Sequence, residues 1–186
     1  MITARLCSRN AHKARELEAL LPGWRVEPLL RDDYPEETGE TYLENARLKA
    51  VFAWREGTWV LAEDSGIEVA ALGGRPGLHS ARYAPEGDPA IAKLLGELAG
   101  NADRRARYVS ELVAISPDGD EFRGTGSLDG AIADGPRGSG GFGYDPIFVP
   151  AGERLTVAEL GDSWKQRHSH RARAAQALLD ALPATS

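Results

Sequence analysis

Apolar runs alternate with helical patterns along this chain, so the sequence predicts an α/β protein. Residues 2–7 form an apolar run, and a polar turn leads from it into helical spacing over residues 11–21. A second apolar run, residues 59–62, stops at two adjacent carboxylates, which is typical of a buried strand that ends in a loop. Residues 106–116 and 121–128 flank a Pro-Asp-Gly-Asp turn and predict a β-hairpin.

Length and composition limit the classes of protein that this chain can belong to. Its 186 residues predict a single domain, 1–186, and a hydrophobic content of 42% is enough for a sizeable core. The net charge of −6 argues against a general nucleic-acid binder. The single cysteine, Cys7, excludes an intramolecular disulfide. Because neither a signal-peptide pattern nor an apolar run of membrane-spanning length is evident, a soluble cytoplasmic protein is the expectation.

The first helix begins with residues that suit an anion site. Asn10 is a good N-cap, and the N–H groups at a helix start attract anions, so Ser8, Asn10 and Lys13 would surround a phosphate there. The glycines and the Lys-Ser/Thr ending of a P-loop are missing. An ordinary capped surface helix explains the same residues.

The other elements follow from local signals. Thr41 and Glu44 match a capping box at the start of a helix, and Ser169 is a suitable N-cap for the last helix, whose apolar positions continue to Leu182. The remaining predicted elements are strands at 24–30, 67–72, 130–133 and 147–149 and helices at 41–56 and 89–98. The last residues, 184–186, are expected to fray.

Three carboxylates indicate chemistry beyond the fold. Glu63 and Asp64 end the predicted strand at 59–62, where an open α/β sheet collects ligands, and acidic side chains there suit a hard cation such as Mg²⁺. One of them could instead deprotonate a water. Glu37 lies just before a helix but is not fully explained by the helix dipole. The alternative is a plain turn, because Asp64, Ser65 and Gly66 are ordinary turn formers.

Two further segments carry features of a binding site. The loop at 135–146 is rich in glycine and contains two aromatic residues, which indicates a ligand that stacks; a flexible loop with its aromatics on the core is the alternative. His170 and Arg171 fall in the first turn of the last helix, where the helix dipole disfavours cations. They therefore suggest an anionic or carbonyl-bearing partner, although a solvated basic face would account for them too.

Taken together and in order, these segments resemble the inosine triphosphate pyrophosphatase family over almost the whole chain. The matching motifs are Ser8-x-Asn10-x-x-Lys13, Glu37-Thr38-Gly39-x-Thr41-x-x-Glu44-Asn45-Ala46, Asp64-Ser65-Gly66, Gly73-Gly74-x-Pro76-Gly77, Ser80-Ala81-Arg82-Tyr83, Gly140-Gly141-Phe142-Gly143-Tyr144-Asp145-Pro146 and Ser169-His170-Arg171. The chain departs from the family pattern at Arg9, where a glycine is common, and at Glu63, where the family often has aspartate.

This resemblance implies a fold and a reaction. It implies an α/β fold with a mixed central sheet flanked by helices, elongated and two-lobed, with a central active-site cleft, and usually a homodimer. It also implies Mg²⁺-dependent hydrolysis of dITP, ITP and XTP to the monophosphate and pyrophosphate, which removes these purine nucleotides from the nucleotide pool. Such an enzyme is expected to bind neither nucleic acid nor membranes.

The same resemblance, with the chemistry above, predicts a role for each site residue. Ser8, Asn10 and Lys13 would bind the phosphates, and Lys49 would neutralise charge around them. Glu37 and Asp64 would hold Mg²⁺ with Glu63 nearby, while Asp64 acts as the general base and Ser65 contacts the substrate. The residues predicted to bind the base are Phe142, Gly143, Tyr144, Asp145, Lys165, His170 and Arg171. Phe142 is the expected stacking residue, and Lys165 is placed by its spacing before His170.

Three rival interpretations remain open at this point. A Maf-like pyrophosphatase would act on pyrimidine or methylated nucleotides. A nucleotide-binding module would bind without turnover, although clustered carboxylates suit a pure phosphate binder poorly. A structural or interaction protein would show no stabilisation by nucleotides.

Overall fold

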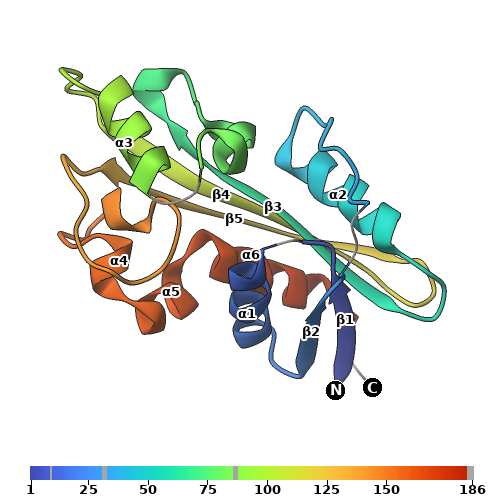
Figure 1. Cartoon of the computed structure of the whole chain (residues 1–186). Helices are drawn as coiled ribbons and strands as arrows, with labels where there is room; N and C mark the ends of the chain where they lie inside the picture. Colours follow the sequence, from blue (N-terminus) through green and yellow to red (C-terminus); the bar gives the residue numbers. More distant parts are fainter. Residues whose placement is uncertain (9, 31–32, 86–87, 184–186) are drawn as a thin grey trace. The chain divides into compact units, whose positions relative to one another are not determined.

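The computed structural model describes residues 1–8, 10–30, 33–85 and 88–183 (Figure 1). Arg9 of the first loop and the tail at 184–186 lie outside the described residues. The strands are β1 (Ile2–Leu6), β2 (Trp24–Pro28), β3 (Trp59–Val69), β4 (Arg105–Ile115), β5 (Glu121–Ile132) and β6 (Phe148–Pro150). The α-helices are α1 (Ala11–Leu20), α2 (Tyr42–Ala53), α3 (Asp88–Glu97), α4 (Val157–Leu160), α5 (Asp162–His168) and α6 (His170–Ala181). The described residues also form three short 3₁₀ helices, η1 (Ala70–Leu72), η2 (Gly77–Arg82) and η3 (Asp145–Ile147).

The strands form one mixed six-stranded sheet in the order β2-β1-β3-β4-β5-β6. Strand β1 pairs in parallel with both β2 and β3, and Ala4 lies opposite Trp59 in the second pairing. Strand β5 pairs antiparallel with β6. The predicted fold class, a mixed sheet flanked by helices, is therefore confirmed.

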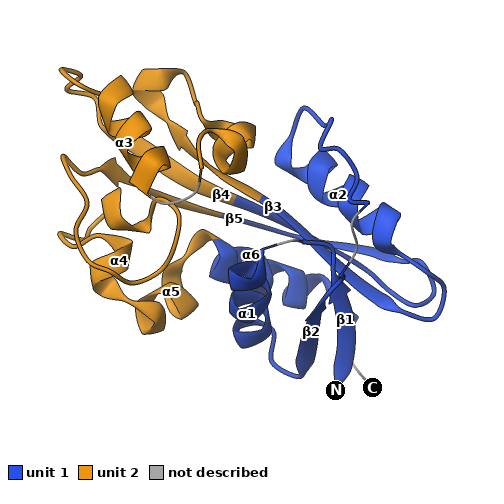
Figure 2. Ribbon diagram, viewed as in Figure 1, with its two compact units in different colours: residues 1–64, 110–126, 171–186 blue, residues 65–109, 127–170 orange. Residues whose placement is uncertain are grey.

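The chain divides into two compact units, drawn in two colours in Figure 2. Unit 1 comprises residues 1–64, 110–126 and the segment from Arg171 onward, and unit 2 comprises residues 65–109 and 127–170. Strands β3, β4 and β5 each contribute residues to both units. The division in β3 falls directly after Asp64.

In unit 1, helices cover both faces of the sheet (Figure 1). Val60 and Ala62 of β3 pack in the cluster that contains the buried side of α2. Leu61, between them, packs instead with Leu17 of α1 and Leu178 of α6. Because successive side chains of a strand point to opposite faces, α2 lies on one face and α1 and α6 lie on the other.

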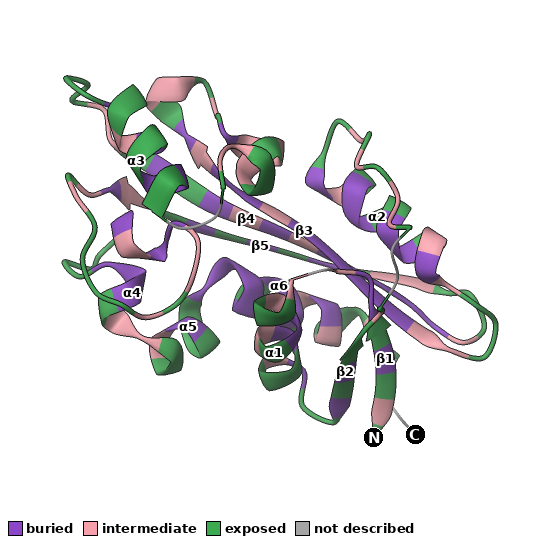
Figure 3. Cartoon of the chain, viewed as in Figure 1, coloured by how far each residue is buried: buried purple, intermediate pink, exposed green. Residues whose placement is uncertain are grey.

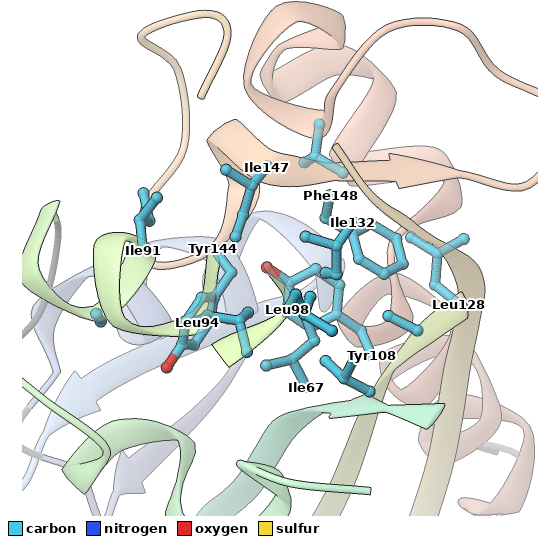
Figure 4. Close-up of a cluster of buried hydrophobic side chains, with 14 residues drawn as sticks. Ile67, Ile91, Leu94, Leu98, Tyr108, Leu128, Ile132, Tyr144, Ile147 and Phe148 are labelled. Atoms are coloured by element: carbon cyan, nitrogen blue, oxygen red, sulfur yellow. The ribbon is translucent and has the colours of Figure 1, made fainter. Parts of the chain in front are cut away.

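Unit 2 has a core of its own, shown in Figure 4. It combines Ile67 of β3, Leu94 of α3, Tyr108 of β4, Leu128 of β5 and Phe148 of β6. Each element contributes the residues of one face or stripe, as expected for strands and helices that bury one side. Within the described residues, no helix has the length and apolar character needed to cross a membrane.

Strand β3 differs from the sequence prediction. A strand that ends at residue 62, a loop, and a second strand from 67 were expected, but β3 runs unbroken from Trp59 to Val69. Residues 60–64 are all buried, Glu63 and Asp64 included (Figure 3). The strand continues through two carboxylates because both are ion-paired, which removes the need for them to reach water.

Smaller differences have local reasons. The segments predicted as 121–128 and 130–133 are one strand, β5, and a Cβ on Gly130 would lie 2.3 Å from the carbonyl oxygen of Val149. Glycine at this position therefore allows β6 to approach closely rather than ending the strand. Helices α4 and α5 were not predicted, although Thr156 and Glu159 form a capping box at the start of α4.

Close packing of β5 on α6 gives a stability prediction. A Cβ on Gly124 would lie 2.0 Å from the carbonyl oxygen of Ala174, so we expect Gly124→Ala to lower the free energy of unfolding by about 3 kcal/mol. Gly96, on the exposed side of α3, has open space around it, and Gly96→Ala should raise the free energy by about 0.5–1 kcal/mol. Urea denaturation of both variants measures their free energies of unfolding. A Gly124→Ala protein as stable as the Gly96→Ala protein would contradict the close packing of β5 on α6.

Candidate active site

The start of α1 is organised as the sequence predicts. Asn10 is the N-cap, and its Oδ1 accepts hydrogen bonds from the backbone N–H groups of His12 at 2.9 Å and Lys13 at 3.3 Å. Ser8 Oγ accepts from the backbone N–H of Asn10 at 3.1 Å. The two side chains hold the loop against the helix start, and the predicted phosphate-binding role of these residues remains a prediction.

Lys13 also belongs to a charge cluster centred on the buried carboxylate of Glu63, which we call the Glu63 cluster (Lys13, Glu16, Glu63, Ser110 and Arg171). Glu63 is 1% exposed. Its Oε1 accepts from Ser110 Oγ at 3.0 Å and lies 3.0 Å from Arg171 Nη2, while its Oε2 lies 2.6 Å from Lys13 Nζ. Arg171 also pairs with Glu16 of α1. The carboxylate of Glu63 thus joins β3 to α1 and α6.

The electrostatics of Arg171 follow from these partners. Burial alone disfavours its charge, but the carboxylates of Glu63 and Glu16 outweigh burial and raise the pKa of Arg171. The sequence suggests an anionic or carbonyl-bearing partner for the cations in the first turn of α6. The protein supplies two such partners itself, from β3 and α1.

A second cluster, the Asp64 cluster (Glu37, Asn45, Lys49 and Asp64), forms on the other face of β3. Lys49 Nζ lies 2.7 Å from Glu37 Oε1 and 3.2 Å from Asp64 Oδ1. Asn45 donates from Nδ2 to Asp64 Oδ2 at 3.3 Å, and its Oδ1 accepts from the backbone N–H of Gly39 at 2.8 Å. Because a backbone N–H only donates, the amide of Asn45 must present its NH₂ to Asp64.

Burial and charge act in opposite directions on the two central groups of this cluster. Burial raises the pKa of Asp64 above its ordinary value, and the ammonium of Lys49 offsets only part of the rise. For Lys49, burial lowers the pKa, but the carboxylates of Asp64 and Glu37 outweigh it and hold the pKa above the usual 10.5. Lys49 is therefore an ammonium stabilised by the carboxylates of Asp64 and Glu37. Of these two, Asp64 is a stronger base than an ordinary aspartate.

The arrangement bears on the predicted metal site. Across the ranges described, no group of three or more side chains of the usual ligand types is placed to hold a metal ion. Glu37 and Asp64 are brought together around one cation, Lys49 Nζ. Glu63, the immediate neighbour of Asp64, projects from the opposite face of β3, and both of its oxygens have cationic or hydroxyl partners.

In unit 2, three of the residues predicted to bind the base, Phe142, Asp145 and Lys165, are tied together through the carboxylate of Asp145. Asp145 Oδ2 accepts from the backbone N–H of Phe142 at 2.9 Å and from Lys165 Nζ at 2.9 Å. Lys165 Nζ also lies 4.6 Å from the centroid of the Phe142 ring. A Cβ on Gly141 would lie 2.1 Å from Asp145 Oδ2, so the glycine allows the loop to close over this carboxylate. Gly143, with a φ of 62°, adopts the left-handed conformation that favours glycine.

Tyr144 and His170 have different neighbours. Tyr144 is buried in the core of unit 2, and its hydroxyl donates to the carbonyl of Ser80 at 3.2 Å. Burial raises the pKa of Tyr144 to about 12. The ring of His170 stacks on Tyr108 with centroids 4.5 Å apart and planes 10° apart. Ser65 follows Asp64 directly in β3.

The sequence therefore predicts most of these residues but gives no local signal for Glu16, Tyr108 and Ser110. Glu16 has the pattern of a surface position of α1, and the predicted hairpin that holds Tyr108 and Ser110 carries no motif of a site. Arg171, predicted to bind the base, is found in the Glu63 cluster of unit 1, while His170 lies in unit 2. The roles of all these residues toward a substrate remain predictions.

The Glu63 cluster predicts a large effect on stability. Glu63→Gln removes the charge that compensates the buried Arg171 and the partly buried Lys13, so we expect it to lower the free energy of unfolding by about 3–5 kcal/mol. Glu121→Gln is the matched control, because Glu121 pairs with Arg47 and Arg123 near the surface, and its loss should cost less than about 1 kcal/mol. Chemical denaturation of both variants tests this, and equal losses would contradict the buried pairing.

Comparisons with known proteins agree with the resemblance. A model of the Ham1 family matches residues 4–181. A dITP/XTP pyrophosphatase of Deinococcus radiodurans is 48% identical over 183 residues, covering 95% of this chain and 90% of that protein. A dITP/XTP pyrophosphatase of Symbiobacterium thermophilum is 49% identical over 186 residues, covering 96% of this chain and 94% of that protein. The fold resembles that of the Staphylococcus aureus Ham1 protein, with a TM-score of 0.81, 39% identity and 94% of each chain covered. This chain therefore belongs to the Ham1 family.

Proposed function

We propose that this chain is a nucleoside-triphosphate pyrophosphatase that hydrolyses dITP, ITP and XTP to the monophosphate and pyrophosphate. The observation that carries the proposal is the buried Asp64, paired with Lys49 and Asn45, in a chain of the Ham1 family. Relatives named dITP/XTP pyrophosphatase, which match more than nine-tenths of this chain, support the choice of substrates. The reaction would clear these purine nucleotides from the nucleotide pool.

The phosphates would bind at the start of α1. A triphosphate carries about four negative charges, so a protein of net charge −6 must supply cations locally to hold it. Lys13 and the positive end of the dipole of α1 provide positive charge there. The hydroxyl of Ser8 and the amide of Asn10 can donate to phosphate oxygens while their own oxygens keep the loop in place. Ser65, next to Asp64 in β3, would contact the substrate as the resemblance implies.

Mg²⁺ is the proposed metal, and the donor set of the Asp64 cluster fits it. Glu37 and Asp64 supply carboxylate oxygens that already share one cation, the ammonium of Lys49. The bound metal would neutralise phosphate charge and lower the pKa of a water. Lys49 would then be available to neutralise charge on the phosphates. In this proposal Glu63, expected near the metal, serves chiefly to hold Lys13 and Arg171.

Asp64 is the proposed general base. It would accept a proton from a water that attacks the α-phosphorus in line, and pyrophosphate would leave. A base works best when its pKa approaches the working pH, so the raised pKa of Asp64 suits the role. Asn45 and Lys49 hold the two carboxylate oxygens in fixed directions.

The residues around Asp145 would bind the base, with Phe142 as the stacking residue. Hypoxanthine and xanthine carry a carbonyl at position 6, where adenine carries an amino group. Lys165 or His170, with Arg171 as a further predicted donor, would donate a hydrogen bond to this carbonyl oxygen. The amino group of adenine would instead set a donor against a donor. A mismatch of this kind between buried donors can change selectivity by several powers of ten.

We also propose that the protein works as a cytoplasmic homodimer, as the resemblance to the family implies. The net charge of −6 gives the chain no general attraction to a nucleic-acid backbone. Light scattering on the purified protein would determine the number of subunits.

A substrate panel tests the proposed function. Pyrophosphate release from dITP, XTP, dATP, dGTP and dTTP should be strong only for dITP and XTP, and EDTA should abolish it. Preferential turnover of dTTP would favour a Maf-like enzyme, and binding of dITP without turnover would favour a nucleotide-binding module.

The assignment of the general base predicts the effect of Asp64→Asn. We expect kcat for dITP to fall by about 10²–10⁴-fold, because the amide cannot accept the proton of the water. Asp118→Asn, in the exposed turn between β4 and β5, should leave kcat unchanged. Steady-state kinetics measures both, and near-normal pyrophosphate release by Asp64→Asn would refute the assignment.

The coupling of Asp64 to Lys49 predicts a shift in the pH profile. Asp64 must be ionised to accept a proton, so kcat/KM should fall as the pH drops through its pKa, which lies above the ordinary 3.8. The ammonium of Lys49 lowers this pKa, so Lys49→Met should move the acidic limb to higher pH. Lys93→Met, a change at an exposed position of α3, should leave the acidic limb in place. A limb that moves to lower pH in Lys49→Met would contradict the pairing.

A further inference from the structure

Tyr108 of β4 contacts two residues to which the proposed function assigns base recognition, His170 and Asp145. Its ring stacks on His170 at 4.5 Å, with the two planes only 10° apart. Its hydroxyl donates to Asp145 Oδ1 at 3.4 Å. It also packs against Phe148, at a centroid distance of 4.5 Å and an interplanar angle of 46°. Tyr108 is 8% exposed, so these contacts are made inside unit 2.

The stack constrains the direction of the His170 ring. The ring nitrogens of histidine donate and accept in the plane of the imidazole, so the orientation of this plane decides where they point. A parallel aromatic neighbour at contact distance restricts rotation of the imidazole about its bond to Cβ. An aliphatic side chain in place of Tyr108 would leave more than one orientation accessible.

The hydroxyl acts on a different part of the same unit. Asp145 Oδ2 accepts from Phe142 N–H and Lys165 Nζ, and Tyr108 contacts the other oxygen. The carboxylate is thus fixed at both ends, and with it the loop that carries Phe142. A single residue of β4 therefore connects the His170 ring to the Asp145 carboxylate.

We propose that Tyr108 is a positioning residue for base selection, which holds His170 through its ring and Asp145 through its hydroxyl. The inference rests on the proposed function, because it assumes that His170 and the residues around Asp145 bind the purine. Tyr108 is not a catalytic residue in this account. It acts on the base only through the groups that it orients.

The test compares Tyr108→Leu with Phe148→Leu. Both variants replace one aromatic ring of the same core cluster with leucine, but only the first removes the stack on His170. For each we would measure kcat and KM for dITP and dATP, the melting temperature, and the affinity for dIMP by calorimetry. Binding of dIMP reports on the base without depending on the chemical step.

We expect Tyr108→Leu to lower the preference for dITP over dATP, measured as a ratio of kcat/KM, by about tenfold. The change should be in KM for dITP and in dIMP affinity, with kcat within about threefold. Phe148→Leu should lose as much melting temperature and keep the wild-type preference. Tyr108→Phe, which keeps the stack but loses the hydroxyl contact with Asp145, should lose part of the preference, by a smaller factor than Tyr108→Leu. If Tyr108→Leu fails to fold, Tyr108→Met replaces it with the same expectation.

Two results would overturn the proposal. The first is an unchanged preference and dIMP affinity in Tyr108→Leu. The second is a loss of preference in Phe148→Leu equal to that in Tyr108→Leu, which would assign the effect to general packing. An equal loss in Tyr108→Phe would likewise overturn it, because that variant keeps the stack on His170. Failure of the proposed function is distinguishable, because it would appear in the wild-type protein as an absence of dITP and XTP turnover.

Discussion

Two adjacent carboxylates buried in one strand are the constraint on which the rest of unit 1 depends. Burying an uncompensated charge costs several kcal/mol, so Glu63 and Asp64 each need cationic partners. Because successive side chains of a strand point to opposite faces, the two cannot share them. Glu63 is paired with Lys13 of α1 and Arg171 of α6, whereas Asp64 is paired with Lys49 of α2. The helices on both faces of β3 are therefore positioned by charge as well as by apolar packing.

This division gives the two carboxylates different roles. In the Glu63 cluster, the charge of the carboxylate is compensated by two cations, and a hydroxyl donates to it as well. These contacts join the start of α1 to β3 and α6. In the Asp64 cluster, burial raises the pKa of Asp64 above its ordinary value, so its carboxylate is a stronger base than that of an exposed aspartate. Unit 2 repeats the theme with Asp145, which orders a lysine and a glycine-rich loop. A buried carboxylate with defined donors thus organises each part of the proposed site.

The sequence predicted what depends on local signals and missed what depends on distant partners. The capping box at Thr41, the N-cap at Asn10 and the hairpin are all encoded by neighbouring residues, and all are confirmed. The continuation of β3 through Glu63 is not encoded by neighbouring residues. It depends on Ser110 and Arg171, which lie 47 and 108 residues away from Glu63 along the chain. The involvement of Tyr108 is likewise set by packing between β4 and α6, which no local pattern reveals.

The central proposal is that the two faces of β3 separate the carboxylates proposed to bind a metal, Glu37 and Asp64, from Glu63, which holds Lys13 and Arg171. Mn²⁺ binding, measured by calorimetry on Glu37→Gln and Glu63→Gln proteins shown to be folded by circular dichroism, tests it most directly, because each variant removes one negative charge. The account predicts that Glu37→Gln weakens Mn²⁺ affinity by more than about tenfold, whereas Glu63→Gln changes it by less than about threefold. An equal or greater loss of affinity in Glu63→Gln would contradict it.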